Sequence, residues 1–240
     1  MFAGVDGCRA GWFLVGIDDS DSWSVDLCRS IQILWAKWHA ARLILIDIPI
    51  GLRDEGATER LCDTEARWRL GPKRGSSVFP APCRAALGAT TYPEACALNV
   101  KHSKRRLSKQ SWALVPKIRQ VNEFLKDTNA ANGRIREVHP ELCFWALNGA
   151  RPMVHRKKSR EGFVERAGVL RLLYPSTAKI VEEALSKWRR YEVGRDDILD
   201  ALVAAVTARM GYGALRSIPD SAEHDRYGIA MKMVYYRTTI

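Results

Sequence analysis

The first 48 residues alternate between short apolar runs and polar turns. The runs "FAGVD" (2–6), "WFLVGID" (12–18) and "WSVDLCRS" (23–30) are separated by short turns, which predicts an antiparallel meander of three strands. The segment 31–41, "IQILWAKWHAA", repeats its apolar residues with helical spacing. The segment 43–48, "LILIDI", is a continuous apolar run, which is typical of a strand buried on both faces. The chain therefore begins strand, strand, strand, helix, strand.

Residues 52–133 have a different pattern. Helix-like segments at 59–70, 92–101 and 113–126 are separated by a loop rich in Gly, Ser and Pro, "GPKRGSSVFPAPCR". We expect a helical insertion here rather than a separate domain with its own linkers. The pattern then returns to a strand, "RIREVH" (134–139), followed by helices at about 161–173, 176–190 and 195–210, and "GIAMKMVYY" (228–236) is a candidate closing strand.

The order of these elements predicts an α/β fold. A meander, a buried strand and a further strand followed by C-terminal helices suit a mixed sheet that is covered by helices on both faces. The length of 240 residues fits one domain, 1–240, that carries the insertion at about 52–133.

Three aspartates occupy positions that secondary-structure propensity does not favour. Asp6 ends the first predicted strand, Asp47 lies inside the apolar fourth strand, and Asp200 lies inside the apolar helix "DDILDALVAAV". Ligands gather at the carboxyl ends of parallel strands, so Asp6 and Asp47 meet there if their strands are adjacent, and the last helix can add Asp200. Converging carboxylates repel one another unless a cation lies between them, and oxygen ligands suit Mg²⁺ or Mn²⁺.

Each acid also has a purely structural interpretation. Asp6 can start the turn at Gly7, and the Asp47 side chain can accept a hydrogen bond from a backbone amide before Pro49. The pair 196–197 can cap the helix, and for Asp196 we favour that interpretation. The structural interpretation is weakest for Asp200, because it follows the first turn of a buried helix.

The net charge of the chain bears on the class of partner that the protein binds. The net charge of +11 favours a polyanion, either nucleic acid or an acidic membrane surface, although a basic soluble protein with no such partner remains an alternative. Positive charge is concentrated in "KHSKRRLSKQSW" (101–112) and "RPMVHRKKSR" (151–160), which can contact phosphates or be solvated helix faces. The segment "GSSVFPAPCR" can present an anion site or serve as a structural brace. The candidate substrate-binding residues are Arg84, Lys109, Arg156, Lys157 and Lys158.

The six cysteines show no CxxC spacing and form no zinc pattern with the histidines, so we expect buried thiols in a reducing cytoplasm. No basic segment followed by an apolar core opens the chain, and no apolar run approaches about 18 residues, so neither a signal peptide nor a membrane span is expected.

Several segments together resemble a known family. "GVDGCRAGW" looks like the first-strand pattern of the ribonuclease H-like superfamily, and "DILDALVAAV" is similar to the C-terminal helix of its Holliday-junction resolvase branch. More closely, the chain from residue 4 to about 210 resembles domain-of-unknown-function family 429, described as predicted nucleases of ribonuclease H fold. The segments that carry this resemblance are "IDIPIGL", "GSSVFPAPCR", "SKQSWALVPKI", "EVHPELCFWALNG" and "KKSREGFVER".

The resemblance implies three antiparallel strands followed by parallel strands, with Asp6 beside Asp47. It assigns the acidic triad to Asp6, Asp47 and Asp200, with Asp197 as a helper and Glu137 as a further candidate metal ligand. No role is assigned near Gln120 and Asn122, where the resemblance leads us to expect acids.

The function that follows is a nuclease dependent on Mg²⁺ or Mn²⁺. It would cleave phosphodiesters with two metals roughly 3.5–4 Å apart. A non-catalytic nucleic-acid-binding or interaction domain of the same fold is the alternative. An actin-like phosphotransferase is less favoured, because the chain shows no second copy of the Asp-Gly strand and turn. DNA or RNA, strandedness, oligomeric state and pathway stay open.

Overall fold

The computed structural model describes residues 1–238 and divides into two compact units. The first unit comprises Met1–Asp47, Gly133–Arg216 and the chain from Val234, and the second comprises Ile48–Asn132 and Ser217–Met233. The segment expected as an insertion at about 52–133 makes up most of the second unit. That the whole chain is one domain stays a prediction.

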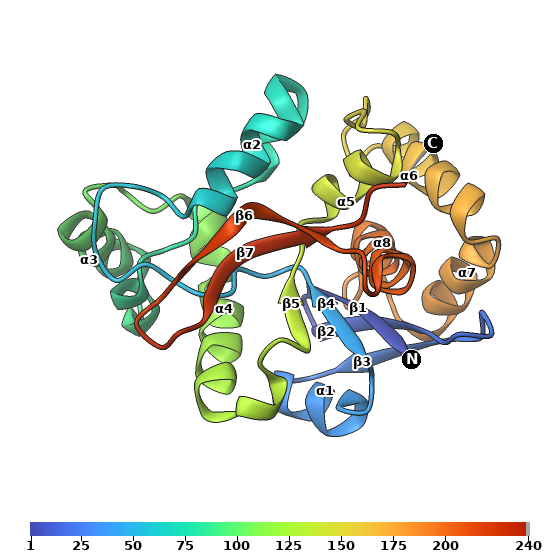
Figure 1. The fold of residues 1–240 in the computed structure, drawn as a ribbon, viewed down its shortest axis with the longest axis horizontal. Coiled ribbons are helices and arrows are strands. Elements are labelled where there is room, and N and C mark those ends of the chain that lie inside the picture. Colours follow the sequence, from blue (N-terminus) through green and yellow to red (C-terminus); the bar gives the residue numbers. More distant parts are fainter. Residues whose placement is uncertain (239–240) are drawn as a thin grey trace. The chain divides into compact units, whose positions relative to one another are not determined.

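The first unit is an α/β structure built on a mixed five-stranded sheet in the order β3-β2-β1-β4-β5 (Figure 1). The strands are β1 (Phe2–Cys8), β2 (Gly11–Ile17), β3 (Trp23–Cys28), β4 (Leu43–Ile46) and β5 (Ile135–Glu137). β1 pairs antiparallel with β2 and β2 with β3, whereas β4 runs parallel to both β1 and β5. The meander and the mixed sheet predicted from the sequence are therefore confirmed.

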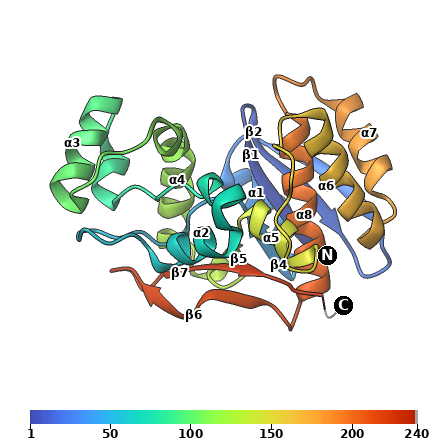
Figure 2. The same cartoon turned by 90° about the horizontal axis from the view of Figure 1, so that it is seen from above.

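Helices cover both faces of this sheet. Gly4 and Gly16 show the two sides, because a Cβ at Gly4 would meet the backbone of α8, whereas a Cβ at Gly16 would meet the Trp38 ring of α1. Figures 1 and 2 show α8 along β1, and α6 and α7 pack against α8. The helices of this unit are α1 (Ile31–Trp38), α5 (Pro140–Leu147), α6 (Arg160–Leu173), α7 (Thr177–Lys187) and α8 (Arg195–Gly211).

The main core lies between the sheet and α8. Side chains at alternate positions of β1, β2 and β4 face α8, whose residues from Ile198 to Val206 are all buried. Burial on every side explains why this helix shows no polar face in the sequence.

The second unit contains helices and most of a pair of strands, β6 and β7, that forms a sheet separate from the five-stranded one. Its elements are α2 (Leu61–Arg74), α3 (Tyr92–Ser103), α4 (Lys109–Asp127), short 3-10 turns at Gly75–Ser77, Arg84–Gly88 and Asn129–Ala131, and the strands β6 (Arg216–His224) and β7 (Ala230–Tyr235). α2 is interrupted at Gly71, where φ is +63°. Its regular part therefore ends at Leu70, where the sequence predicts the end.

Four details differ from the sequence predictions. β1 continues to Cys8, so Asp6 lies inside the strand rather than at its end, and β4 stops at Ile46, so Asp47 follows the strand. α5 was not predicted, because nearly all of its residues are buried and it lacks an amphipathic period. The candidate closing strand pairs with the unpredicted β6, whose Pro219 argues against a strand.

The cysteines agree with the expectation of buried thiols, since all six are buried and none forms a disulfide among the described residues.

Candidate metal centre

Two neighbouring strands bring Asp6 and Asp47 together. β1 and β4 pair in parallel with Val5 opposite Ile46, so the next residues on the two chains are also neighbours. The Asp47 amide continues the pairing by donating to the Val5 carbonyl at 2.9 Å. Because side chains alternate along a strand, Asp6 shares the α8 face with Gly4, and Asp47 shares it with Leu45.

α8 adds Asp200 because it packs very close to β1. A Cβ built on Gly4 would lie 2.1 Å from the Ala201 carbonyl oxygen and 2.1 Å from the Ala205 amide nitrogen, so only glycine fits there. Alanines at 201, 204 and 205 complete the close packing on the helix side. Asp200 directly precedes Ala201, so this close packing brings Asp200 next to Asp6, which lies two residues after Gly4 in β1.

The three carboxylates converge. Asp6, Asp47 and Asp200 each offer an oxygen, and these atoms all lie within 4.8 Å of one another. Asp6 and Asp200 are buried, with 7% and 2% of their surface exposed, and Asp47 is half-buried. The sequence prediction that these three residues meet is therefore correct in geometry.

Few hydrogen-bond donors serve this group. The Asp6 Oδ1 atom accepts from the Gly7 amide at 2.7 Å, and Asp200 Oδ2 accepts from the Lys157 ammonium at 2.8 Å. No residue in the described range 1–238 donates a hydrogen bond to the Asp47 carboxylate. The sequence-based alternative of a bond from Asp47 to a backbone amide is thus not seen.

Burial and mutual repulsion raise the proton affinity of the group. Burial, followed by the charges of Asp47 and Asp200, raises the pKa of Asp6 well above its usual range. Burial, followed by the charge of Asp200, raises the pKa of Asp47 to about 7. Burial and the closeness of the carboxylates therefore favour the uptake of positive charge, which either protons or a cation can supply.

Within residues 1–238, Lys157 is the one side-chain cation that bonds to any of the three aspartates, and it bonds to Asp200. Its Nζ atom lies 2.8 Å from Asp200 and 3.9 Å from Asp196, and 40% of its side chain is exposed. The charge of Asp200 raises the pKa of Lys157, which keeps the ammonium charged. The sequence prediction listed Lys157 among phosphate-binding residues, but nothing in its spacing indicated a contact with Asp200.

Asp196 and Asp197 lie in the first turn of α8, after the N-cap residue Gly194. The Asp197 Oδ2 atom accepts from the Gly194 amide at 2.8 Å, which satisfies a backbone donor at the helix start. Burial raises the pKa of Asp197, and the neighbouring charges of Asp196 and Asp200 raise it further. The structure therefore places Asp197 beside the group as a helix-capping residue. The interpretation of Asp196 as the N-cap residue is wrong, because Gly194 occupies that position and Asp196 lies in the first turn.

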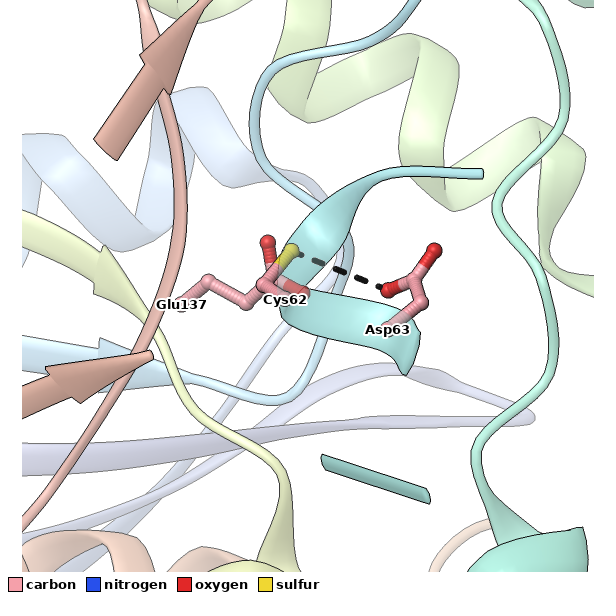
Figure 3. Close-up of side chains that lie close together, drawn as sticks. All are labelled: Cys62, Asp63 and Glu137. Atoms are coloured by element: carbon pink, nitrogen blue, oxygen red, sulfur yellow. Dashed lines mark hydrogen bonds between the residues drawn. The ribbon is translucent and has the colours of Figure 1, made fainter. Parts of the chain in front are cut away.

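Glu137 is not brought to the three aspartates. It ends β5 (Figure 3) and pairs in register with Ile46, so the alternation of side chains puts it on the sheet face opposite Asp47. Figure 3 also shows Cys62 and Asp63 at the start of α2, where the thiol donates to the Asp63 carboxylate at 3.8 Å. Asp63 belongs to a buried ion pair with Arg60, whose guanidinium donates to it at 2.5 and 3.2 Å. The charge of Asp63 is therefore already neutralised by Arg60, within the second unit.

The remaining predicted substrate-binding residues are dispersed. Arg156 and Lys158 are exposed on either side of Lys157 in the first unit, and Lys109 is exposed as the first residue of α4 in the second. Arg84 instead bonds to Asp54, Asp225, Asn122 and the Leu52 carbonyl, all in the second unit. These contacts favour the structural-brace interpretation for Arg84.

Sequence reasoning missed two residues that shape the centre. Apart from the position of Lys157 in a basic run, nothing in the sequence indicates that it contacts the centre. Gly4 did leave a signal, because a glycine inside an apolar strand indicates a close approach of backbone.

None of the helices within residues 1–238 combines the length and the hydrophobicity needed to cross a bilayer.

Searches of curated proteins and of solved structures returned no match to the chain. The model of one family, described as "Protein of unknown function (DUF429)", matches residues 4–224, which is nearly the whole chain and includes all three aspartates. The chain therefore belongs to the DUF429 family.

Proposed function

We propose that this protein is a metal-dependent nuclease that hydrolyses phosphodiester bonds and holds Mg²⁺ or Mn²⁺ on Asp6, Asp47 and Asp200. One observation carries the proposal: carboxylate oxygens from a strand, a strand end and a helix lie within 4.8 Å of one another. Oxygen atoms about 2.1 Å from a shared ion can be separated by at most about 4.2 Å, so small side-chain movements would complete the sphere.

The residues present fit a hard divalent cation. The donor set consists of carboxylates, which Mg²⁺ and Mn²⁺ prefer, and it contains no thiol or imidazole. The Asp47 carboxylate receives no hydrogen bond from residues 1–238, so its lone pairs are available to an ion. Among residues 1–238, one ammonium, that of Lys157, bonds to this group, and it does not balance the charge of three carboxylates.

When bound, a divalent cation of this kind supplies an activated water and stabilises the charge that develops on the leaving oxygen. The protein residues have separate tasks. Asp6 and Asp47 are fixed by the parallel pairing of β1 and β4, and Asp200 is fixed by the packing of α8 on Gly4. Lys157 keeps its charge beside the same carboxylates, so it offers a donor to a phosphate oxygen that enters the centre.

Two further features support a ribonuclease H-like nuclease acting on nucleic acid. The first three strands are antiparallel, the fourth and fifth run parallel to the first, and an acidic residue follows on the C-terminal helix, which is the arrangement that the sequence resemblance implies. The net charge of +11 favours a polyanionic substrate.

The test is cleavage of labelled single-stranded, duplex and branched DNA and RNA, with Mn²⁺ and with a chelator. Wild type should cleave at least one substrate with Mn²⁺ only. Asp200→Asn keeps the shape of the side chain but removes a ligand charge, and it should lower the rate at least about a hundredfold, since metal stabilisation of the transition state is worth several kcal/mol.

Asp196→Asn is the matched control, because it removes the same charge from the same helix outside the group of three. It should retain activity within about threefold, a change of less than 1 kcal/mol. Failure of the wild type to cleave any substrate while binding Mn²⁺ would leave a metal-binding protein that is not a nuclease. Equal losses in the two variants would remove Asp200 from the centre.

A further inference from the structure

A cavity of about 130 Å³ lies entirely within the second unit, and none of the residues that line it belongs to the metal centre. Four parts of the chain form its wall: the loop 53–60, the segment 80–83 from "GSSVFPAPCR", Asn99 and Ser103 of α3, and the segment 105–111 from "KHSKRRLSKQSW". The segments "GSSVFPAPCR" and "KHSKRRLSKQSW" are each anion-binding candidates in the sequence, and the fold brings them together around one space.

The wall of the cavity is rich in arginine. Arg53, Arg60, Arg105 and Arg106 line it, against the acids Glu55 and Glu59. Three of these arginines have partners: Arg53 bonds to Glu223, Arg60 to Asp63 and Arg105 to Glu59. Arg106 is exposed at the wall and forms no hydrogen bond or ion pair with any residue in the described range 1–238. Its five guanidinium donors are available to an anion.

The start of α4 adds to this positive potential. Ser108 caps the helix and lines the cavity, and the first turn contains Lys109 but no acidic residue. A helix N-terminus carries partial positive charge, so a cation there is unfavourable unless an anion compensates. An anion near Arg106 and Ser108 would relieve that imbalance.

Part of the wall is apolar, and several of its polar side chains already have partners. Pro80, Pro82 and Leu107 provide flat, buried or half-buried surface. The Ser111 hydroxyl donates to the Pro80 carbonyl at 3.0 Å, and the Asn99 amide donates to the Arg105 carbonyl at 2.8 Å. An engineered cavity of about 150 Å³ holds benzene, so this space is suited to a single six-membered ring.

We propose that this cavity binds a nucleotide, with a single-ring base against the prolines and the phosphate on Arg106 at the start of α4. The site goes beyond the proposed nuclease activity and does not require it. The phosphate can belong to a free pyrimidine nucleotide or to the terminal nucleotide of a nucleic acid, and both present the same ring and the same phosphate oxygens.

The experiment measures binding of three probes by calorimetry at low salt: inorganic phosphate, cytidine 5′-monophosphate and a short 5′-phosphorylated single-stranded oligonucleotide. A chelator is present throughout, so that the metal centre plays no part. Wild type should bind the mononucleotide more tightly than inorganic phosphate. Arg106→Glu should weaken binding of the mononucleotide at least about tenfold, because a charged hydrogen bond is lost and a repulsive charge takes its place.

Arg171→Glu is the matched control, because Arg171 is an exposed arginine of the first unit and its replacement changes the net charge by the same amount. It should bind within about twofold of wild type, since Arg171 does not line the cavity and an exposed charge is largely screened by salt. A tenfold loss for the oligonucleotide as well would assign the site to nucleic-acid ends, whereas a loss for the mononucleotide alone would assign it to free nucleotide; both outcomes support the proposal.

Three outcomes would overturn the proposal: no probe binds wild type at millimolar concentration, Arg106→Glu binds as well as Arg171→Glu, or inorganic phosphate binds as tightly as the mononucleotide. Asp200→Asn should bind the mononucleotide like wild type. Failure of the nuclease proposal would therefore leave this test unaffected.

Discussion

Asp47→Asn should make the metal-free protein more stable relative to wild type as the pH rises from 5 to 8. The pKa of Asp47 is raised from an ordinary value of 3.8 to about 7, mainly because the carboxyl is surrounded by protein and close to Asp200. A group with a raised pKa in the folded state favours folding while it is protonated. That contribution is complete below pH 3.8 and is lost as the pH rises through about 7.

The size of the effect follows from the same values. The pKa shift of Asp47 from 3.8 to about 7 corresponds to a contribution of about 4 kcal/mol to the free energy of unfolding. Roughly 2.5 kcal/mol of this contribution is lost between pH 5 and pH 8. Because Asp47 is half-buried, solvent screening lowers this figure, and we expect about 1–2 kcal/mol. The asparagine that replaces Asp47 does not titrate, so the variant does not lose this stability as the pH rises.

The assay is thermal unfolding of both proteins in chelator at pH 5 and pH 8. For a protein of this size, about 1–2 kcal/mol moves the melting temperature by roughly 2–8 °C. The difference between variant and wild type is the informative quantity, since the general effect of pH on a chain of charge +11 is nearly the same for both. A difference that does not change with pH, or that changes in favour of wild type at pH 8, would refute the assignment of Asp47 to a crowded acidic centre.

Three other outcomes follow from the geometry. Gly4→Ala places a Cβ 2.1 Å from the α8 backbone, so it should destabilise the protein by about 3 kcal/mol or more and lower its affinity for Mn²⁺. Thermal unfolding with and without Mn²⁺ measures both effects, and a variant of normal stability would mean that α8 does not pack on Gly4. Lys157→Met removes the ammonium that competes for Asp200, so a calorimetric titration at pH 8 should show Mn²⁺ binding unchanged or tighter, and weaker binding would assign Lys157 a supporting role instead. Replacing the exposed Arg156 and Lys158 by Ala should reduce the dependence of nucleic-acid affinity on salt by a log–log slope of about 1–2, and an unchanged slope would place the phosphate contacts elsewhere.

The sequence was sufficient for the sheet and for the group of three aspartates. Short apolar runs with turns between them predict the meander, and the continuous run at 43–48 predicts a strand in the interior of the sheet, where β4 lies between β1 and β5. Once these strands are neighbours, the acids at 6 and 47 meet, because the two chains run in parallel and their side chains alternate in step. Asp200 could be selected because a charged residue in the middle of a buried helix needs a partner.

The parts that were missed depend on packing between distant segments. The bond from Lys157 to Asp200 joins residues 43 positions apart, and a run of adjacent basic residues gives no indication of which one turns inward. β6 contains Pro219, and its pairing with β7 does not show in its residue pattern. The cavity of the second unit likewise depends on segments that are separate in the sequence.

A crystal structure with Mn²⁺, with the ion located by its anomalous scattering, tests the central claim most directly. We predict a Mn²⁺ peak bound by oxygens of Asp6, Asp47 and Asp200 at about 2.1–2.2 Å, with the Lys157 ammonium withdrawn from Asp200. Three aspartates without a peak at millimolar Mn²⁺, with Lys157 still bonded to Asp200 at 2.8 Å, would mean that the lysine alone balances these carboxylates and that the site is not a metal centre.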